Sequence, residues 1–171
     1  MTKTLLAGGV AATLLVVSLG GCQKPEAAKP AVDAGKIADA VKADAQQLVA
    51  DFNAHDAVKS VAHDAPGFVG MAHGSANVVG PDGDLAATKL QVADPATKIT
   101  VKDETVDVAV AGDMAIYRAT YTFTFTDPKT KTPKTEIGNW LIGYKAQSDG
   151  TWKIAWDVVS DTPAPAAAKS A

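Results

Sequence analysis

The chain has 171 residues and a nearly balanced charge, with 16 Lys and Arg against 19 Asp and Glu. A mildly acidic chain without a basic run lacks the electrostatic footprint of a nucleic-acid-binding protein, so we expect no nucleic-acid partner. Its single cysteine excludes an internal disulfide and any metal site built from several thiolates.

Residues 1–21 are predicted to be a lipoprotein signal peptide. Lys3 supplies a short positive region, residues 5–19 are apolar and uncharged, and small residues precede Cys22. The ending LGGC resembles a bacterial lipobox, in which the cysteine is lipidated and becomes the mature N-terminus. Two alternatives stay open: a transmembrane anchor, because the apolar run is near the minimum spanning length, and a plain secreted protein.

The lipid on Cys22 would attach the protein to a membrane of the bacterial cell envelope. The residue after the cysteine is Gln23 and not Asp. By resemblance to bacterial lipoproteins, this implies an anchor in the outer membrane, with the domain facing the periplasm. Residues 22–32 are rich in Pro and Ala and predict a flexible tether. Residues 33–161 predict one domain, and residues 162–171 a disordered tail.

Three helices are expected in the first half of the domain. Asp33 can cap a long helix to about Asn53, and Asp56 can cap a short one through Val61. After a short strand at 68–73 and a turn at 80–83, a third short helix is expected over residues 85–92, capped by Asp82 or Asp84.

The second half predicts four strands. Residues 98–110 alternate, but the apolar phase slips near 103–105, which indicates a bulge. From 113 to 160 three alternating runs follow, the last two joined by a turn at Asp149-Gly150. Helices gathered on one face of a curved antiparallel sheet make an α+β fold.

This order of elements resembles the nuclear transport factor 2-like superfamily, in particular its SnoaL-like branch. The resemblance covers residues 35–160. It is carried by Phe52-Asn53-Ala54-His55-Asp56, Gly80-Pro81-Asp82, Val110-Ala111-Gly112-Asp113-Met114-Ala115, Gly138-Asn139-Trp140 and the run 149–160.

The resemblance implies a cone-shaped domain whose bent sheet wraps a pocket closed by the long first helix. Homodimers through the sheet are common in such proteins. Some members are isomerases, cyclases or dehydratases, and many are binding or association modules. The family often carries His where this chain has Trp156, which weakens the case for an enzyme.

A ketosteroid-isomerase-like reaction needs a carboxylate base and a donor for the enolate oxygen. Asp157 is the candidate base, with Tyr121 or Tyr117 as the donor. Strict alternation instead places Asp157 in phase with Lys153 and Ala155, outside the pocket and in water, and this interpretation is favoured. Core packing is likewise favoured over catalysis for the two tyrosines.

Aromatic side chains on the expected strands can line an apolar pocket for a flat ligand or fill the core. The expected ligand-binding set is Tyr117, Tyr121, Trp140 and Trp156, while Tyr144 and Trp152 share a phase with the two tryptophans.

The three histidines do not form a recognisable metal motif. His55, His63 and His73 lack the spacing that places two imidazoles on one helical face, so we expect neither a metal nor a cofactor. His63 or His73 near the pocket mouth is a weaker candidate for an acid or base, since histidine titrates near neutrality.

The sequence thus favours a lipid-anchored envelope domain that binds a small apolar or aromatic molecule or dimerises without catalysis. An isomerase- or cyclase-like enzyme using proton transfer on a hydrophobic substrate is the alternative. A third hypothesis is a filled pocket and a purely structural role in assembly.

Overall fold

A computed structural model describes residues 31–161 of the chain. The predicted signal peptide, Cys22, most of the tether and the tail at 162–171 lie outside the described residues. No helix in the described part is long and apolar enough to cross a membrane. The described elements are α1 (Ala34–Asn53), α2 (Ala57–Val61), β1 (Asp64–Ala72), β2 (Val78–Val79), α3 (Gly80–Val92), β3 (Lys98–Val108), β4 (Met114–Thr126), β5 (Pro133–Ala146) and β6 (Trp152–Asp161).

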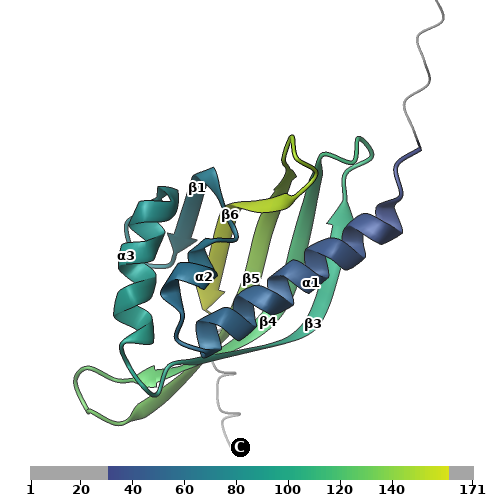
Figure 1. Cartoon of the computed structure of the whole chain (residues 1–171). Coiled ribbons are helices and arrows are strands. Elements are labelled where there is room, and N and C mark those ends of the chain that lie inside the picture. Colours follow the sequence, from purple (N-terminus) through teal and green to yellow (C-terminus); the bar gives the residue numbers. More distant parts are fainter. Residues whose placement is uncertain (1–30, 162–171) are drawn as a thin grey trace, which may run out of the picture. The chain divides into compact units, whose positions relative to one another are not determined.

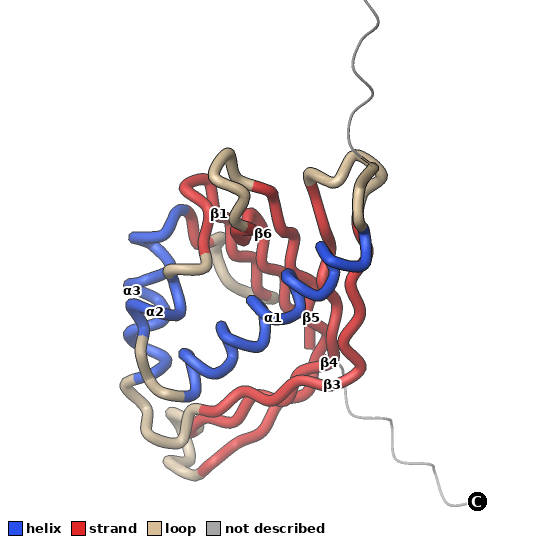
Figure 2. The backbone as a smooth tube through the Cα atoms, turned by 45° about the vertical axis from the view of Figure 1, so that its right-hand side comes forward, coloured by secondary structure: helices blue, strands red, loops and turns tan. Residues whose placement is uncertain are grey.

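The strands form one curved sheet in the order β2-β1-β6-β5-β4-β3. All neighbouring pairs are antiparallel except β1 and β6, which are parallel. The helices cover one face of this sheet, and α1 crosses it obliquely in front of β3, β4 and β5 (Figure 1). The sheet bends around α1 (Figure 2), so the α+β cone architecture expected from the sequence is confirmed.

Helix α1 is fixed to the sheet at both its beginning and its end. Asp33 caps it by accepting a 3.0 Å hydrogen bond from the backbone N–H of Lys36. The apolar stripe faces the sheet, where Val41 is fully buried. At the last residue, the Asn53 amide donates to the carbonyl of Ile99 and accepts from its N–H, both at 2.8 Å. This paired bond joins the end of α1 to the start of β3.

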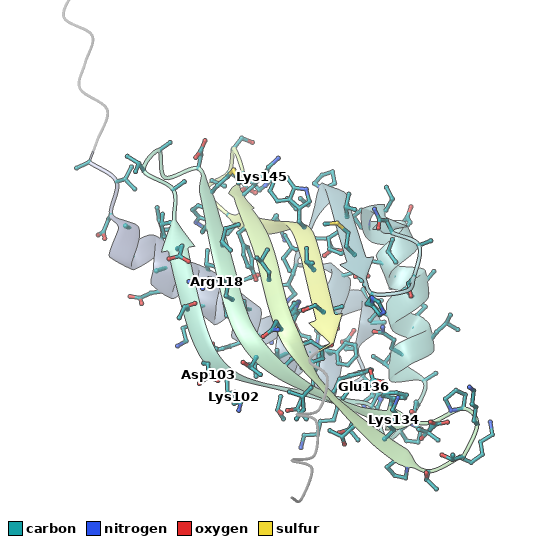
Figure 3. The ribbon with its side chains drawn as sticks, turned by 180° about the vertical axis from the view of Figure 1, so that it is seen from behind. Lys102, Asp103, Arg118, Lys134, Glu136 and Lys145 are labelled. Atoms are coloured by element: carbon teal, nitrogen blue, oxygen red, sulfur yellow. The ribbon has the colours of Figure 1, made fainter. Side chains whose placement is uncertain are left out.

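Strand β4 shows why the two faces of the sheet differ. Its alternation buries Tyr117 and Tyr121 under the helices, as expected. Arg118 projects from the opposite face, where its guanidinium meets Asp107 on β3 at 2.7 Å (Figure 3). The floor beneath the helices is therefore apolar and aromatic, and the outer face is more polar.

The bulge predicted in the first long strand is present. Lys102 pairs with Thr120 and Thr105 with Arg118, so two residues of β3 oppose one of β4. Asp103 takes up the distortion with a φ of 57°. Beyond the bulge, the side chain of Val106 again faces the helices, and β3 follows the curve of the sheet.

Helix α3 begins earlier than expected. Gly80 adopts a φ of 73°, which an L side chain rarely does, and Pro81 occupies the first turn, where its missing N–H costs nothing. The stretch interpreted as a turn is therefore helical. As a result Asp84 lies inside the helix instead of capping it.

Candidate functional site

A cavity of about 600 Å³ lies between the concave face of the sheet and the helices. All six strands of the sheet contribute lining residues, and the end of α1, one residue of α2 and one side of α3 also line it. Most of its lining is apolar, which is typical of small-molecule sites. The apolar lining residues include Leu48, Val49, Phe52, Phe68, Met71, Val78, Ile99, Phe123 and Val159.

One carboxylate, Asp157 on β6, is exposed to this apolar cavity and is held by the neighbouring strand. The indole N–H of Trp140 on β5 donates a 2.6 Å hydrogen bond to its Oδ1. Burial raises the pKa of Asp157 to about 7, although the Trp140 bond opposes this shift. Both side chains line the cavity. Asp157 therefore exchanges its proton near neutrality.

The inward direction of Asp157 is a correction to the expectation from strict alternation. Gly143 pairs with Trp156 but Tyr144 pairs with Ile154, so Ala155 is an extra, unpaired residue in β6. This bulge reverses the phase of the strand beyond it. Asp157 and Val159 consequently face the helices, which the sequence pattern alone did not indicate.

The same bulge moves Trp156 to the outer face of the sheet. Its ring packs over Gly143 and lies 4.4 Å from the Nζ of Lys145, a cation–π contact. Trp156 is not among the residues that line the cavity. The expectation that it lies in the pocket is therefore wrong for this residue, whereas Trp140 lies where it was expected.

The two candidate tyrosines have different surroundings. Tyr121 lines the cavity together with Asp157 and Trp140. Tyr117 lies deeper in the core, fully buried, with its ring edge-on to Trp140 at 6.2 Å. Burial raises the pKa of the Tyr117 phenol, and the nearby Glu104 adds to this shift. Only Tyr121 of this pair can contact a molecule in the cavity.

A pair of carboxyl groups lies close to Asp157. Asp84 on α3 lines the cavity, and its carboxyl group is within hydrogen-bonding reach of Asp64 at the start of β1. Oδ2 of Asp64 is buried and receives no hydrogen bond from any described donor. Two carboxyl groups can bond to each other only if one carries a proton.

The surroundings of this pair favour that shared proton. Burial raises the pKa of Asp64 to about 8, and the charges of Asp84 and Asp157 add to the effect. Burial also raises the pKa of Asp84, while its contact with Asp64 opposes the rise. Asp64, Asp84 and Asp157 thus form an acidic cluster at one end of the cavity, and near neutrality it holds protons.

The histidines lie apart from this cluster, each in a different setting. His73 is exposed and lines the cavity mouth. His63 is buried under α1, with Nδ1 2.8 Å from Asp44 and Nε2 3.4 Å from Asp51. The bond to Asp44 is the main reason that the pKa of His63 is raised. His63 does not line the cavity, which leaves His73 as the only one of the two candidates able to meet a bound molecule there.

His55 lies outside the cavity lining, and its Nδ1 is 2.6 Å from the carbonyl oxygen of Val92 at the end of α3. Among the described residues, no group of three or more His, Cys, Asp or Glu side chains is arranged to hold a metal ion.

Comparison with known proteins supports the fold but gives no close relative. No family model and no curated protein matches the sequence. Solved structures do match. A ketosteroid isomerase-like protein from Erwinia carotovora shares 20% identity at a TM-score of 0.61, over 73% of this chain and 96% of its own. A nuclear transport factor 2-like superfamily protein from Salmonella enterica shares 12% identity at a TM-score of 0.63, over 80% of this chain and 99% of its own.

A nuclear transport factor 2-like protein with a cystatin-like fold from Novosphingobium aromaticivorans shares 15% identity at a TM-score of 0.61, over 77% of this chain and 85% of its own. This chain has the nuclear transport factor 2-like fold. At these identities the likeness concerns the backbone and not the pocket residues.

The sequence does not indicate Asp64 or Asp84 as site residues of this domain. The sequence indicates Asp84 only as an alternative to Asp82 for capping the helix, although its four-residue spacing to Thr88 places both side chains on one side of α3. Thr88 is buried and also lines the cavity. Asp64 follows His63 directly and has no sequence signal of its own, because its role arises from the contact between β1 and α3.

Proposed function

We propose that the domain binds a small, largely apolar molecule in the cavity, with Asp157 as the polar anchor. The observation that carries the proposal is the Trp140–Asp157 pair. It fixes one carboxyl group in a lining that is otherwise mostly apolar. A cavity of about 600 Å³ is within the usual range for small ligands, and it argues against the hypothesis of a filled, purely structural core.

Binding is tested with a neutral apolar fluorophore, N-phenyl-1-naphthylamine, titrated into the purified domain. We expect saturable enhancement of its fluorescence and energy transfer from Trp140. Phe68→Trp, which fills part of the cavity, is expected to weaken binding about tenfold or more, corresponding to about 1.4 kcal/mol. Trp156→Phe, on the outer face, is the matched control and is expected to bind like wild type. No saturable binding at all would reject the proposal.

Proton transfer within the same cavity is the second candidate function. Asp157 has a pKa close to neutrality, and Tyr121 lines the same space, so the base and donor of an isomerase-type reaction are both available. The test follows hydrogen exchange at the α-carbon of 3-cyclohexenone in D₂O by NMR. Asp157→Asn is expected to abolish protein-dependent exchange, while Glu136→Gln, on β5 in the same lining, retains it. Equal exchange rates in wild type and in both variants would exclude catalysis by Asp157 and would leave ligand binding as the function of the cavity.

We also propose that the domain is carried on a lipid anchor at Cys22 in the bacterial envelope. The apolar run and the LGGC ending support this address. Replacing Cys22 with Ser should move the protein from the membrane fraction to the soluble fraction. An unchanged distribution would count against lipidation.

Self-association through the outer face of the sheet is the remaining proposal. Ile137 and Leu141 on β5 are exposed by 51% and 39% on this face. Sedimentation velocity is expected to give a dimer for wild type and a monomer for Leu141→Lys. A wild-type monomer at all concentrations would exclude it.

A further inference from the structure

Acidic side chains predominate among the charged groups that line the cavity. Asp84, Asp157 and Glu136 line it, and no Lys or Arg does so among the described residues. Asp64 does not line the cavity but interacts with Asp84 and Asp157, so the acidic cluster contains three carboxyl groups besides Glu136. The basic group nearest in sequence to Glu136 is Lys134, whose Nζ is 2.7 Å from the Glu136 carboxylate, so this ion pair already uses its charge.

The side chains that meet at the acidic cluster are three carboxyl groups and a neutral indole, with His63 next to Asp64. Helix α3 contributes Asp84, β1 contributes Asp64, β5 contributes the indole N–H of Trp140, and β6 contributes Asp157. His63 acts on Asp64 from the far side, where Asp44 and Asp51 flank it. A negatively charged ligand would therefore meet the negative charge that remains on the cluster, and His73 is the one basic side chain in the cavity lining among the described residues.

The walls next to the cluster are aromatic. Trp140, Tyr121, Phe68 and Phe123 all line the cavity. Aromatic faces attract cations at distances up to about 6 Å and contribute roughly 0.5–2 kcal/mol each when water is excluded. Buried carboxylates without a counter-ion are costly, and an entering cation would remove that cost.

We propose that the cavity takes an organic cation, with an apolar or aromatic body and a single ammonium group placed between Asp157 and Asp84. This inference rests on the proposed small-molecule binding and adds the chemical class of the ligand. It also assigns Asp84, which the sequence indicated only as a helix cap, to ligand recognition. Because the cluster holds protons when empty, binding of an ammonium group releases protons to the solvent.

The test uses three probes of one shape: 1-naphthylmethylamine, 1-naphthylmethanol and 1-naphthoic acid, measured by isothermal titration calorimetry. The amine is expected to bind about tenfold or more tightly than the alcohol, and the acid more weakly than both. Titrations of wild type in two buffers of different ionisation enthalpy are expected to show net proton release for the amine. As the pH increases toward neutrality, the affinity for the amine should increase by up to about tenfold per pH unit. Above about pH 8 the affinity should become independent of pH.

Two variants locate the effect. Asp157→Asn and Asp84→Asn are each expected to remove most of the amine's advantage over the alcohol and to leave the affinity for the alcohol within about threefold. Asp82→Asn, on the same helix but exposed and outside the lining, is the matched control and should behave like wild type. Circular dichroism verifies folding, and proton release by wild type stands as a test even if one variant does not fold.

The outcomes separate this inference from the proposal it rests on. If none of the three probes binds, small-molecule binding itself fails. If the alcohol binds as tightly as the amine, and its affinity falls as the pH rises, the cluster acts as a protonated donor toward a neutral ligand, and the cationic class is wrong.

Discussion

Trp140 and Asp157 lie diagonally across the β5–β6 pairing, and the indole N–H donates to the Asp157 carboxylate at 2.6 Å. Ile142 is the direct partner of Asp157, so Trp140 reaches it from two residues along the neighbouring strand. A long aromatic side chain spans this distance, whereas a shorter donor would not. The pair therefore fixes both the position of the carboxylate and the orientation of the indole plane at the cavity wall.

Replacing Trp140 with Phe should raise the pKa of Asp157, because the hydrogen bond that favours its charged form is lost. The domain should also lose about 1–3 kcal/mol of stability. The pKa is measured from the carboxyl ¹³C shift of Asp157 across a pH titration. Trp156→Phe removes an indole from the outer face and should leave this pKa unchanged. A lower pKa in Trp140→Phe would show that the bond does not stabilise the carboxylate.

Asp64 should make the domain less stable as the pH rises. Its pKa is about 8 in the folded protein against 3.8 ordinarily, so the stability it contributes is fully present below about pH 4 and is lost as the pH approaches 8. The Asp64→Asn variant should show a weaker dependence of stability on pH. At about pH 8 its free energy of unfolding should exceed that of wild type by roughly 1 kcal/mol, after allowance for partial exposure. Thermal unfolding at several pH values measures it. Parallel curves for the two proteins would contradict the assignment.

His63 contributes a second pH dependence through Asp44. The pKa of His63 is raised in the folded protein, so this stabilisation is fully present below its ordinary value of 6.5 and is lost as the pH rises through the raised value. Asp44→Asn should lower the pKa of His63, as measured by NMR of its ring protons, and should destabilise the domain most at about pH 6. Asp39→Asn, exposed on the same helix, is the control. An unshifted His63 titration would refute the pairing.

Gly138 is a position where any side chain should be harmful. A Cβ there would overlap the carbonyl oxygen of Ser160 and would lie 2.6 Å from the Tyr121 ring. Gly138→Ala should therefore destabilise the domain by about 1–3 kcal/mol or more, because a backbone atom of β6 must move. Gly67→Ala, whose Cβ would meet nothing within 4 Å, is the matched control. Denaturant unfolding compares the two, and equal midpoints would show that the sheet accommodates the methyl group.

Local patterns were sufficient to predict most of the fold. The caps at Asp33 and Asp56 and the alternation around Tyr117 are local signals, and the structure matches them. The bulge near Asp103 was also predictable, because apolar residues on both sides of it revealed the change of phase. The parallel pairing of β1 with β6 was not, since it joins strands far apart in the sequence.

The candidate site was harder to predict because it depends on tertiary contacts. The bulge at Ala155 left no visible change of phase, since apolar residues occur on both faces of β6 and hid the slip. Asp64 and Asp84 come together only when α3 packs on β1. A carboxylate at such a position looks like an ordinary surface residue in the sequence.

The unpaired Ala155 also has a consequence for how this scaffold can change its chemistry. Loss of that one codon would pair the last strand regularly, and the residues beyond it would exchange faces. An indole would then enter the hollow and the acid would turn outward to water, on an almost unaltered backbone. In this fold, a single insertion or deletion in the last strand can thus change which side chains line the cavity, without any substitution.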